Sequence, residues 1–231
     1  MTVQTDHHHQ ARQDPAAFWL QQATRIEWHT PPRTAFDASA APTLRWFPDG
    51  VTNLCHNAVD RHLDARADQV ALAWESSEVD ARLTQTYAQL WQAVNACAAA
   101  LRALGVGRGD RVLIYMPMVP QAIHTMLACA RLGAVHSVVF GGFAAGSLAK
   151  RLRDATARLI VTADAGPRGG RVIRYKPLVD EARALADMPT LPALVLRRGL
   201  DADLPWQSGV DHDYAELTTD LANVQIPCEW V

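Results

Sequence analysis

The sequence predicts an α/β fold, built on a mostly parallel sheet with flanking helices. Short apolar segments rich in β-branched residues alternate with longer segments in which apolar residues recur at helical spacing. The strand-like segments recur about every 25–35 residues, which is the length that βαβ units need. They are apolar throughout, as strands of a parallel sheet are when helices cover both faces.

The N-terminal part of the chain lacks this alternation. Residues 1–15 are polar, so we expect a disordered tail, and no apolar segment there resembles a secretory signal. Residues 16–54 are rich in tryptophan and proline, which predicts an N-terminal extension laid over the main domain. The main α/β domain is expected over 55–231.

The elements of the main domain can be predicted in order. We expect a helix over 53–63, and then strands over 70–74 and 82–84. Thr86 and Gln89 have capping-box spacing and predict the start of a helix, which Gly105 ends. The alternation continues as strand 112–115, helix 120–133, strand 135–140, helix 144–155, strand 159–162, helix 178–186 and strand 193–196. From Gly199 the chain reads as an irregular tail, so the sheet looks unfinished.

Two glycine-rich loops that follow predicted strands form the candidate ligand site. The first is Gly141–Gly142, and the second is Gly166–Gly170, which carries Arg168 and is followed by Arg171. The carboxyl ends of parallel strands meet at one edge of the sheet, where ligands bind, so the two loops are expected to lie together. Glycine lets backbone N–H groups approach a ligand, and guanidinium groups suit phosphate. This pattern predicts a phosphorylated ligand.

Structural interpretations of the same residues stay open. The glycine pair can simply make a tight turn, and arginines in a surface turn are commonly solvated. Asp164 either belongs to the site or caps the turn after its strand. His136 is expected to be a buried imidazole, and three methionines are expected to fill the core: Met116, Met118 and Met126.

Several function classes are excluded or disfavoured. The sequence contains no P-loop, no GxSxG elbow and no HExxH pair, and its cysteines form no CxxC, so no metal site is predicted. The net charge of −2 disfavours nucleic acid as a partner, and no apolar run is long enough to cross a membrane. Cys97 and Cys129 lie on apolar faces, which indicates free thiols in a reducing compartment, the cytoplasm.

Long motifs carry a family resemblance over nearly the whole chain. They are RWFPDGVTNLCHNAVDRHL at 45–63, LGVGRGDRVLIYMPMVPQA at 104–122, MLACARLGAVHSVVFGGFA at 126–144 and TADAGPRGGRVIRYKPLVDEA at 162–182. With them the chain resembles the N-terminal part of the acetyl-CoA/propionyl-CoA synthetase family, within the adenylate-forming superfamily. TNLCHNAVDRHL, RGGR and YKPLVDEA together look more like the propionate–CoA ligases than the acetate–CoA ligases.

The resemblance implies a two-step, AMP-forming ligase. Propionate or acetate reacts with ATP, with Mg²⁺ present, to give an acyl-adenylate and pyrophosphate; the CoA thiol then displaces AMP. The resemblance also implies that Arg168 and Arg171 pair with a CoA phosphate and that Ile173 flanks the adenine. The full set of residues that it places at the nucleotide end of CoA is Phe140, Gly141, Gly142, Arg168, Gly169, Gly170, Arg171 and Ile173.

Members of this family continue for several hundred residues beyond the point matching Val231. We therefore expect 55–231 to be an incomplete N-terminal (adenylation) domain of an acyl-CoA synthetase, truncated before the ATP phosphate loop. Catalytic residues, ATP and Mg²⁺ sites are expected outside this chain, and the chain alone is expected to be inactive.

Two other interpretations are retained. The chain can be a non-enzymatic CoA- or nucleotide-binding module, or a subunit completed by another polypeptide. A dehydrogenase-type dinucleotide domain shares the fold class but is disfavoured, because the GxGxxG fingerprint is missing. The expected partners are small molecules, and no prediction follows for the oligomeric state. An incomplete sheet is also expected to leave an exposed edge.

Overall fold

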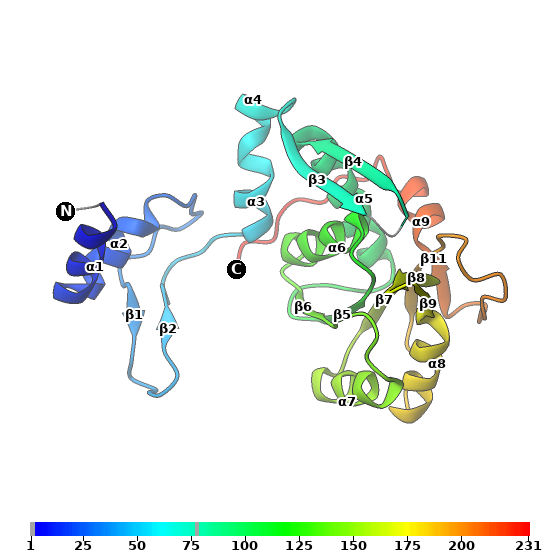
Figure 1. The fold of residues 1–231 in the computed structure, drawn as a ribbon. Helices are drawn as coiled ribbons and strands as arrows, with labels where there is room; N and C mark the ends of the chain where they lie inside the picture. Colours follow the sequence, from blue (N-terminus) through cyan, green and yellow to red (C-terminus); the bar gives the residue numbers. More distant parts are fainter. Residues whose placement is uncertain (1–2, 77–78) are drawn as a thin grey trace.

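The structure is a computed structural model that describes residues 3–76 and 79–231 (Figure 1). Its centre is a five-stranded sheet in which every neighbouring pair of strands is parallel. The strands lie in the order β11 (Asp211–Asp213), β10 (Ala193–Leu196), β7 (Leu159–Ala163), β5 (Arg111–Tyr115) and β6 (Val135–Val138). The predicted α/β class with a mostly parallel sheet is therefore confirmed.

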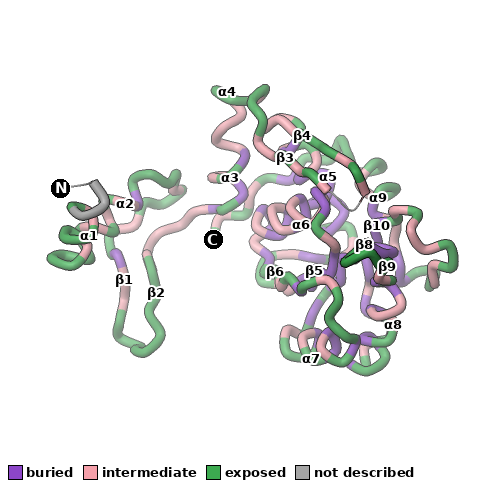
Figure 2. Tube along the Cα trace, in the orientation of Figure 1, coloured by how far each residue is buried: buried purple, intermediate pink, exposed green. Residues whose placement is uncertain are grey.

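Helices cover both faces of this sheet. On β5, Val112 and Ile114 face one apolar core, while Leu113 and Tyr115 face the other, because side chains alternate along a strand. The first core is closed by α5 (Tyr87–Ala103), α6 (Pro120–Arg131) and α9 (Tyr214–Asp220). The second is closed by α7 (Ala145–Ala155) and α8 (Tyr175–Leu185). Buried residues accordingly concentrate in this part of the chain (Figure 2).

The edge strand β6 departs from this pattern. Val135 and Val138 are more than half exposed, and His136 is exposed as well. The expectation that His136 is a buried imidazole is therefore wrong, because its strand has a neighbour on one side only. The five-stranded sheet has two edge strands, β6 and β11, and the residues of β6 are the more exposed.

Local sequence signals explain how the first helix of the alternation begins and ends. The Thr86 hydroxyl accepts a hydrogen bond from the Gln89 N–H at 3.2 Å, and the Gln89 side chain accepts one from the Thr86 N–H at 2.9 Å. This confirms the predicted capping box of α5. Gly105 follows the helix with φ of +83°, a conformation that glycine adopts without strain.

The region before α5 is more broken than predicted. The helix expected over 53–63 is divided into α3 (Leu54–Ala58), a 3₁₀ turn (Asp60–His62) and α4 (Leu63–Arg66). The division falls at Val59, whose φ of −130° and ψ of −64° are not helical. The two predicted strands form an antiparallel pair, β3 (Val70–Ser76) and β4 (Ala81–Thr86).

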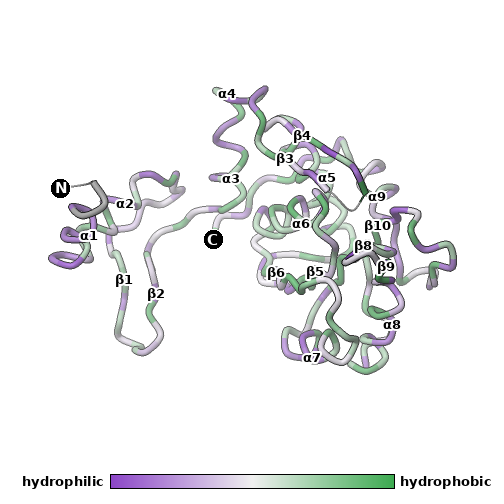
Figure 3. Tube along the Cα trace, viewed as in Figure 1, coloured by the Kyte–Doolittle hydropathy of each residue, from purple (hydrophilic) through white to green (hydrophobic). Residues whose placement is uncertain are grey.

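The N-terminal residues form two helices. The first, α1 (Val3–Gln13), is mostly hydrophilic (Figure 3) and lies within the range 1–15, where a disordered tail is expected. That expectation is wrong for residues 3–13, whereas residues 1 and 2 lie outside the described part of the chain. The negative charge of Asp6 in its first turn and the positive charge of Arg12 in its last turn both interact favourably with the helix dipole. The second, α2 (Pro15–Ala23), is capped by Asp14, whose carboxylate accepts from the Ala17 N–H at 3.0 Å. The domain boundaries themselves stay a prediction.

Residues 3–51, which we call the arm, lie beside the main body and not over it (Figure 1). This corrects the expected packing of 16–54. The aromatic residues of the arm pack on one another instead, as in the ring contacts of Trp46 with Trp19 and Phe36, both at 5.5 Å. These contacts surround the short pair β1 (Phe36–Asp37) and β2 (Arg45–Trp46).

The C-terminal part is more ordered than predicted. Instead of an irregular tail after Gly199, the chain adds the edge strand β11 and then α9, which Asp213 caps. The last segment runs back to the start of the body, where Thr52 and Val231 exchange two backbone hydrogen bonds of 2.9 and 3.0 Å. None of the described helices has the length and apolar character needed to cross a membrane.

Candidate functional site

The strand order places a crevice between β5 and β7. The chain leaves β5 toward β6 on one side, and leaves β7 toward β10 on the other side. Ligands of open α/β sheets bind at such a reversal, outside the carboxyl ends of the strands. A cleft of about 380 Å³ opens there, and the residues lining it include Trp74, Met116, Pro117, Met118, Phe140, Gly141, Pro167, Arg168, Tyr175 and Arg198.

The second glycine-rich segment is a β-hairpin and not the loop predicted over 166–170. Strands β8 (Ala165–Arg168) and β9 (Arg171–Arg174) pair in antiparallel register. Gly169 and Gly170 connect them with φ of +56° and +74°. Two successive residues with positive φ are typical of the tight hairpin turn that suits glycine. The hairpin sets Arg168 directly opposite Arg171.

Arg168 joins the hairpin to the first glycine segment. Its guanidinium donates a hydrogen bond to the carbonyl oxygen of Gly141. The same group lies 4.4 Å from the centre of the Phe140 ring, within cation–π distance. The structure therefore brings together Phe140, Gly141, Gly142 and Arg168, as the sequence predicted from the sheet edge, with Arg171 beside them on the hairpin. Their role in binding stays a prediction.

Two tyrosines fix the backbone of the first glycine segment. The Tyr115 hydroxyl donates to the Phe143 carbonyl at 3.0 Å and accepts from the Gly142 N–H at 3.3 Å. Burial raises the pKa of Tyr115, which keeps this hydroxyl protonated. Tyr175 packs edge-on against Tyr115, with ring centres 4.9 Å apart.

The space at the glycines is taken up by these neighbours. A Cβ atom on Gly141 would overlap the Tyr175 hydroxyl and lie 3.1 and 3.2 Å from two further atoms of that ring. Gly142 has a φ of +101°, so glycine is needed there for conformation as well. The glycines thus permit close packing within the protein, in addition to any approach of a ligand.

The remaining predicted residues differ in accessibility. Gly169, Gly170 and Arg171 are exposed on the hairpin. Ile173 is half-buried and packs against the core beneath α7 and α8, so only part of its side chain faces solvent.

Sequence reasoning missed some of the residues that line the cleft. The Trp74 indole donates to the Met118 carbonyl at 2.7 Å, and Arg198 donates to the Ala165 carbonyl at 3.2 Å. Met118 was expected in the core, but its side chain is 82% exposed, because it lies in the bend after β5 and before α6. Met116 is buried as expected.

Asp164 has a structural role at the end of β7. One carboxylate oxygen accepts from the Ala165 N–H at 2.6 Å, and the other accepts from the N–H groups of Arg198 and Leu200 at 2.8 and 3.1 Å. The side chain is buried, so these bonds supply the partners that a buried carboxylate needs. Of the two interpretations, the geometry favours the turn cap. Asp164 also links the ends of β7 and β10.

Comparisons with known proteins identify the family. Residues 59–222 match the sequence profile described as AMP-binding enzyme, and residues 4–58 match that of the acetyl-coenzyme A synthetase N-terminus. The chain belongs to the AMP-binding enzyme family. The resemblance drawn from the sequence motifs is therefore confirmed.

Individual relatives agree with this assignment. The chain is 50% identical to the propionate–CoA ligase of Salmonella typhimurium, over 94% of this chain and 35% of the ligase. It is 44% identical to the acetyl-coenzyme A synthetase of Streptomyces coelicolor, over 97% of this chain and 36% of that enzyme. The solved acetoacetyl-CoA synthetase from Streptomyces lividans superposes with a TM-score of 0.80 at 27% identity, over 94% of this chain and 32% of that chain. The chain thus spans about a third of the length of these relatives.

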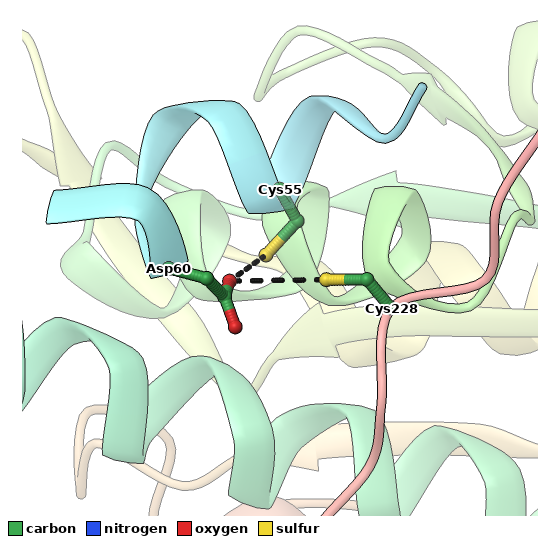
Figure 4. A group of neighbouring side chains, drawn as sticks. All are labelled: Cys55, Asp60 and Cys228. Atoms are coloured by element: carbon green, nitrogen blue, oxygen red, sulfur yellow. Dashed lines mark hydrogen bonds between the residues drawn. The ribbon is translucent and has the colours of Figure 1, made fainter. Parts of the chain in front are cut away.

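This member of the AMP-binding family also contains a polar cluster that the sequence did not reveal (Figure 4). Cys55 of α3, Asp60 of the 3₁₀ turn and Cys228 of the C-terminal segment offer three ligand atoms within 4.8 Å of one another. Arg131 of α6 donates to both oxygens of Asp60, at 2.8 and 2.9 Å. Cys55 and Cys228 lie far apart in the sequence, so no motif spacing indicated that they would meet.

Proposed function

We propose that the chain is the N-terminal part of a short-chain acyl-CoA ligase that uses propionate or acetate, ATP and CoA. In this reaction the carboxylate attacks the α-phosphorus of ATP, releasing pyrophosphate, and the CoA thiol then displaces AMP from the acyl-adenylate. The family assignment and the names of the relatives support the proposal. The observation that supports CoA binding by this chain is the hydrogen bond from the Arg168 guanidinium to the Gly141 carbonyl, which lies where the strand order reverses.

Within this proposal, the cleft and the hairpin bind the nucleotide end of CoA. Arg168 and Arg171 lie opposite each other and are both exposed, so two guanidinium groups can meet phosphate from one hairpin. Gly169 and Gly170 leave the turn between them free of side chains, and the exposed part of Ile173 is proposed to flank the adenine. Phe140, Gly141 and Gly142 form the facing wall.

Other parts of the proposed reaction are assigned to residues outside this chain. The group of described residues that could hold a metal ion offers two thiols and one carboxylate, from Cys55, Asp60 and Cys228. Mg²⁺ prefers oxygen ligands, so this group does not fit it. We propose that Mg²⁺, the ATP phosphates and the acyl group bind beyond these 231 residues, and that this chain alone does not form an acyl-adenylate.

We also propose a reducing compartment, the cytoplasm, for the protein. All four cysteines are free, and Cys55, Cys97 and Cys129 are buried. Free thiols of this kind are typical of intracellular proteins.

The binding proposal is tested by titrating CoA into the chain and into Arg168→Ala by calorimetry. A hydrogen bond to a charged group contributes about 1.5–3 kcal/mol, so the variant should bind CoA about 10- to 100-fold more weakly. Arg102→Ala is the matched control, because Arg102 is exposed in the last turn of α5, on a helix that does not line the cleft. Equal affinity of the chain and Arg168→Ala would refute the site.

The catalytic part is tested separately. The chain is incubated with propionate, ATP and Mg²⁺, and hydroxylamine traps any acyl-adenylate as a hydroxamate. No hydroxamate is expected, and its formation would refute the assignment of the adenylation site to other residues. CoA binding without adenylation is the result that both parts of the proposal require.

A further inference from the structure

The C-terminal segment brings Cys228 to Cys55, which lies on a different part of the chain. The Cys55 and Cys228 sulfur atoms lie 3.9 and 3.8 Å from the same oxygen of Asp60, and within 4.8 Å of each other. Figure 4 shows the two side chains extending into the same space from α3 and from the C-terminal segment. Two thiols this close together can be joined in a disulfide when an oxidant is supplied.

The surroundings favour thiol chemistry over metal binding. Both oxygens of Asp60 already accept hydrogen bonds from Arg131, and one also accepts from the Trp91 indole at 3.0 Å. A metal ion coordinated by Asp60 would have to compete with a guanidinium that is 3% exposed. The same guanidinium lies 3.4 Å from the Cys55 sulfur, where it can stabilise a thiolate.

The four cysteines therefore differ in reactivity. Burial raises the pKa of Cys97 to about 11 and also raises the pKa of Cys129, which keeps both thiols protonated. A hydrogen bond with Cys228, together with the charge of Arg131, lowers the pKa of Cys55 despite its burial. Cys228 is partly exposed, so a small oxidant in solution can reach the pair through it.

We propose that Cys55 and Cys228 form an oxidation-sensitive dithiol that closes to an intramolecular disulfide in the presence of hydrogen peroxide. The Cys55 thiolate, stabilised by Arg131, attacks one peroxide oxygen and becomes a sulfenic acid, and the hydroxide that is released takes up the proton lost from Cys55 to form water. The Cys228 thiol then attacks the Cys55 sulfur, and the sulfenic hydroxyl leaves with the Cys228 proton as water. In total, two thiols are oxidised to one disulfide, and one peroxide is reduced to two waters.

The disulfide would fasten the C-terminal segment to α3. That segment is already held by the Asn53 side chain, which donates to the Glu229 carbonyl at 2.6 Å, and by the backbone pairing of Thr52 with Val231. The cross-link would close a loop of most of the chain, so the oxidised protein should unfold at a higher temperature than the reduced protein.

The test uses the full 231-residue chain. The reduced chain is treated with peroxide, the remaining thiols are alkylated with N-ethylmaleimide, and the peptides are mapped by mass spectrometry. The expected product is a peptide pair joined through Cys55 and Cys228, with Cys97 and Cys129 alkylated only after unfolding, and dithiothreitol should reverse the cross-link. Separate alkylation of Cys55 and Cys228, or disulfides between molecules only, would overturn the proposal.

Variants and a metal complete the test. Cys228→Ser should abolish the cross-link, whereas the matched control Cys129→Ala should keep it. Addition of Zn²⁺ in equal amount should leave the wild-type thiols open to oxidation. If Zn²⁺ instead protects Cys55 and Cys228 from both peroxide and maleimide, the cluster is a metal site and the proposal is wrong.

Discussion

Replacement of Gly141 by alanine tests how the candidate site is packed. The added methyl group would overlap the Tyr175 hydroxyl and lie 3.1 and 3.2 Å from two ring atoms. Tyr175 is 2% exposed and packs on Tyr115, so its ring has little room to move. The substitution therefore forces a shift in a buried aromatic pair that also holds the glycine segment.

The expected cost follows from this geometry. Overpacking a well-filled site by one methyl group costs about 1–3 kcal/mol. Gly146 provides the matched control, because it lies in the first turn of α7 and a Cβ atom there would have nothing within 4 Å. Gly146→Ala should instead stabilise the protein by about 0.4–1 kcal/mol, since alanine loses less entropy in a helix. The same substitution is thus expected to lower the free energy of unfolding at Gly141 and to raise it at Gly146.

The assay is urea unfolding followed by tryptophan fluorescence, together with CoA titration. Gly141→Ala should lower the free energy of unfolding and weaken CoA binding, whereas Gly146→Ala should do neither. Tyr175→Phe removes the overlapping oxygen and should relieve part of the loss when combined with Gly141→Ala. Two equally stable alanine variants would refute the close packing described for Gly141.

Two further predictions concern stability and pH. Burial raises the pKa of Asp60, but the hydrogen bonds and charge of Arg131 outweigh this effect and hold the pKa below 3.8. The ion pair therefore stabilises the fold above about pH 4, and this contribution is lost as the pH falls through the lowered pKa. Asp60→Asn should therefore cost about 3–5 kcal/mol at neutral pH, because Arg131 stays buried without its partner, and a loss under about 1 kcal/mol in urea unfolding would contradict this. Burial lowers the pKa of His124 from 6.5 to about 4, so unfolding free energy should fall by on the order of 3 kcal/mol as the pH drops from 6.5 to 4. His124→Leu should flatten that part of the stability–pH curve, and an unchanged slope would show that another group is responsible.

The parallel sheet could be predicted because its signals are local. Apolar runs, the Thr86 capping box and Gly105 each act over a few residues, and the structure reproduces them. The meeting of Gly141 with Arg168 was also predictable, because it follows from the direction of parallel strands and needs no knowledge of side-chain contacts.

The errors lie where distant contacts decide the outcome. Met118 and His136 read as core residues, but a bend and an edge strand expose them. The sequence of the arm predicts a layer that covers the main domain, yet its aromatic side chains pack on one another. Tyr175 gave no signal as a site residue, because its role depends on a glycine far away in the sequence.

The buried carboxylate of Asp164 has a consequence for how mutational data on this protein are interpreted. It ties the start of the hairpin to the turn after β10, and both segments contribute residues to the lining of the cleft. Loss of the carboxylate would therefore shift both sides of the cleft. A variant at this position would weaken ligand affinity without any direct contact between Asp164 and the ligand. Such a phenotype, at an acidic residue beside the candidate cleft, would resemble the loss of a catalytic base. Only a measurement of the free energy of unfolding of the same variant would distinguish a structural role of Asp164 from a catalytic one.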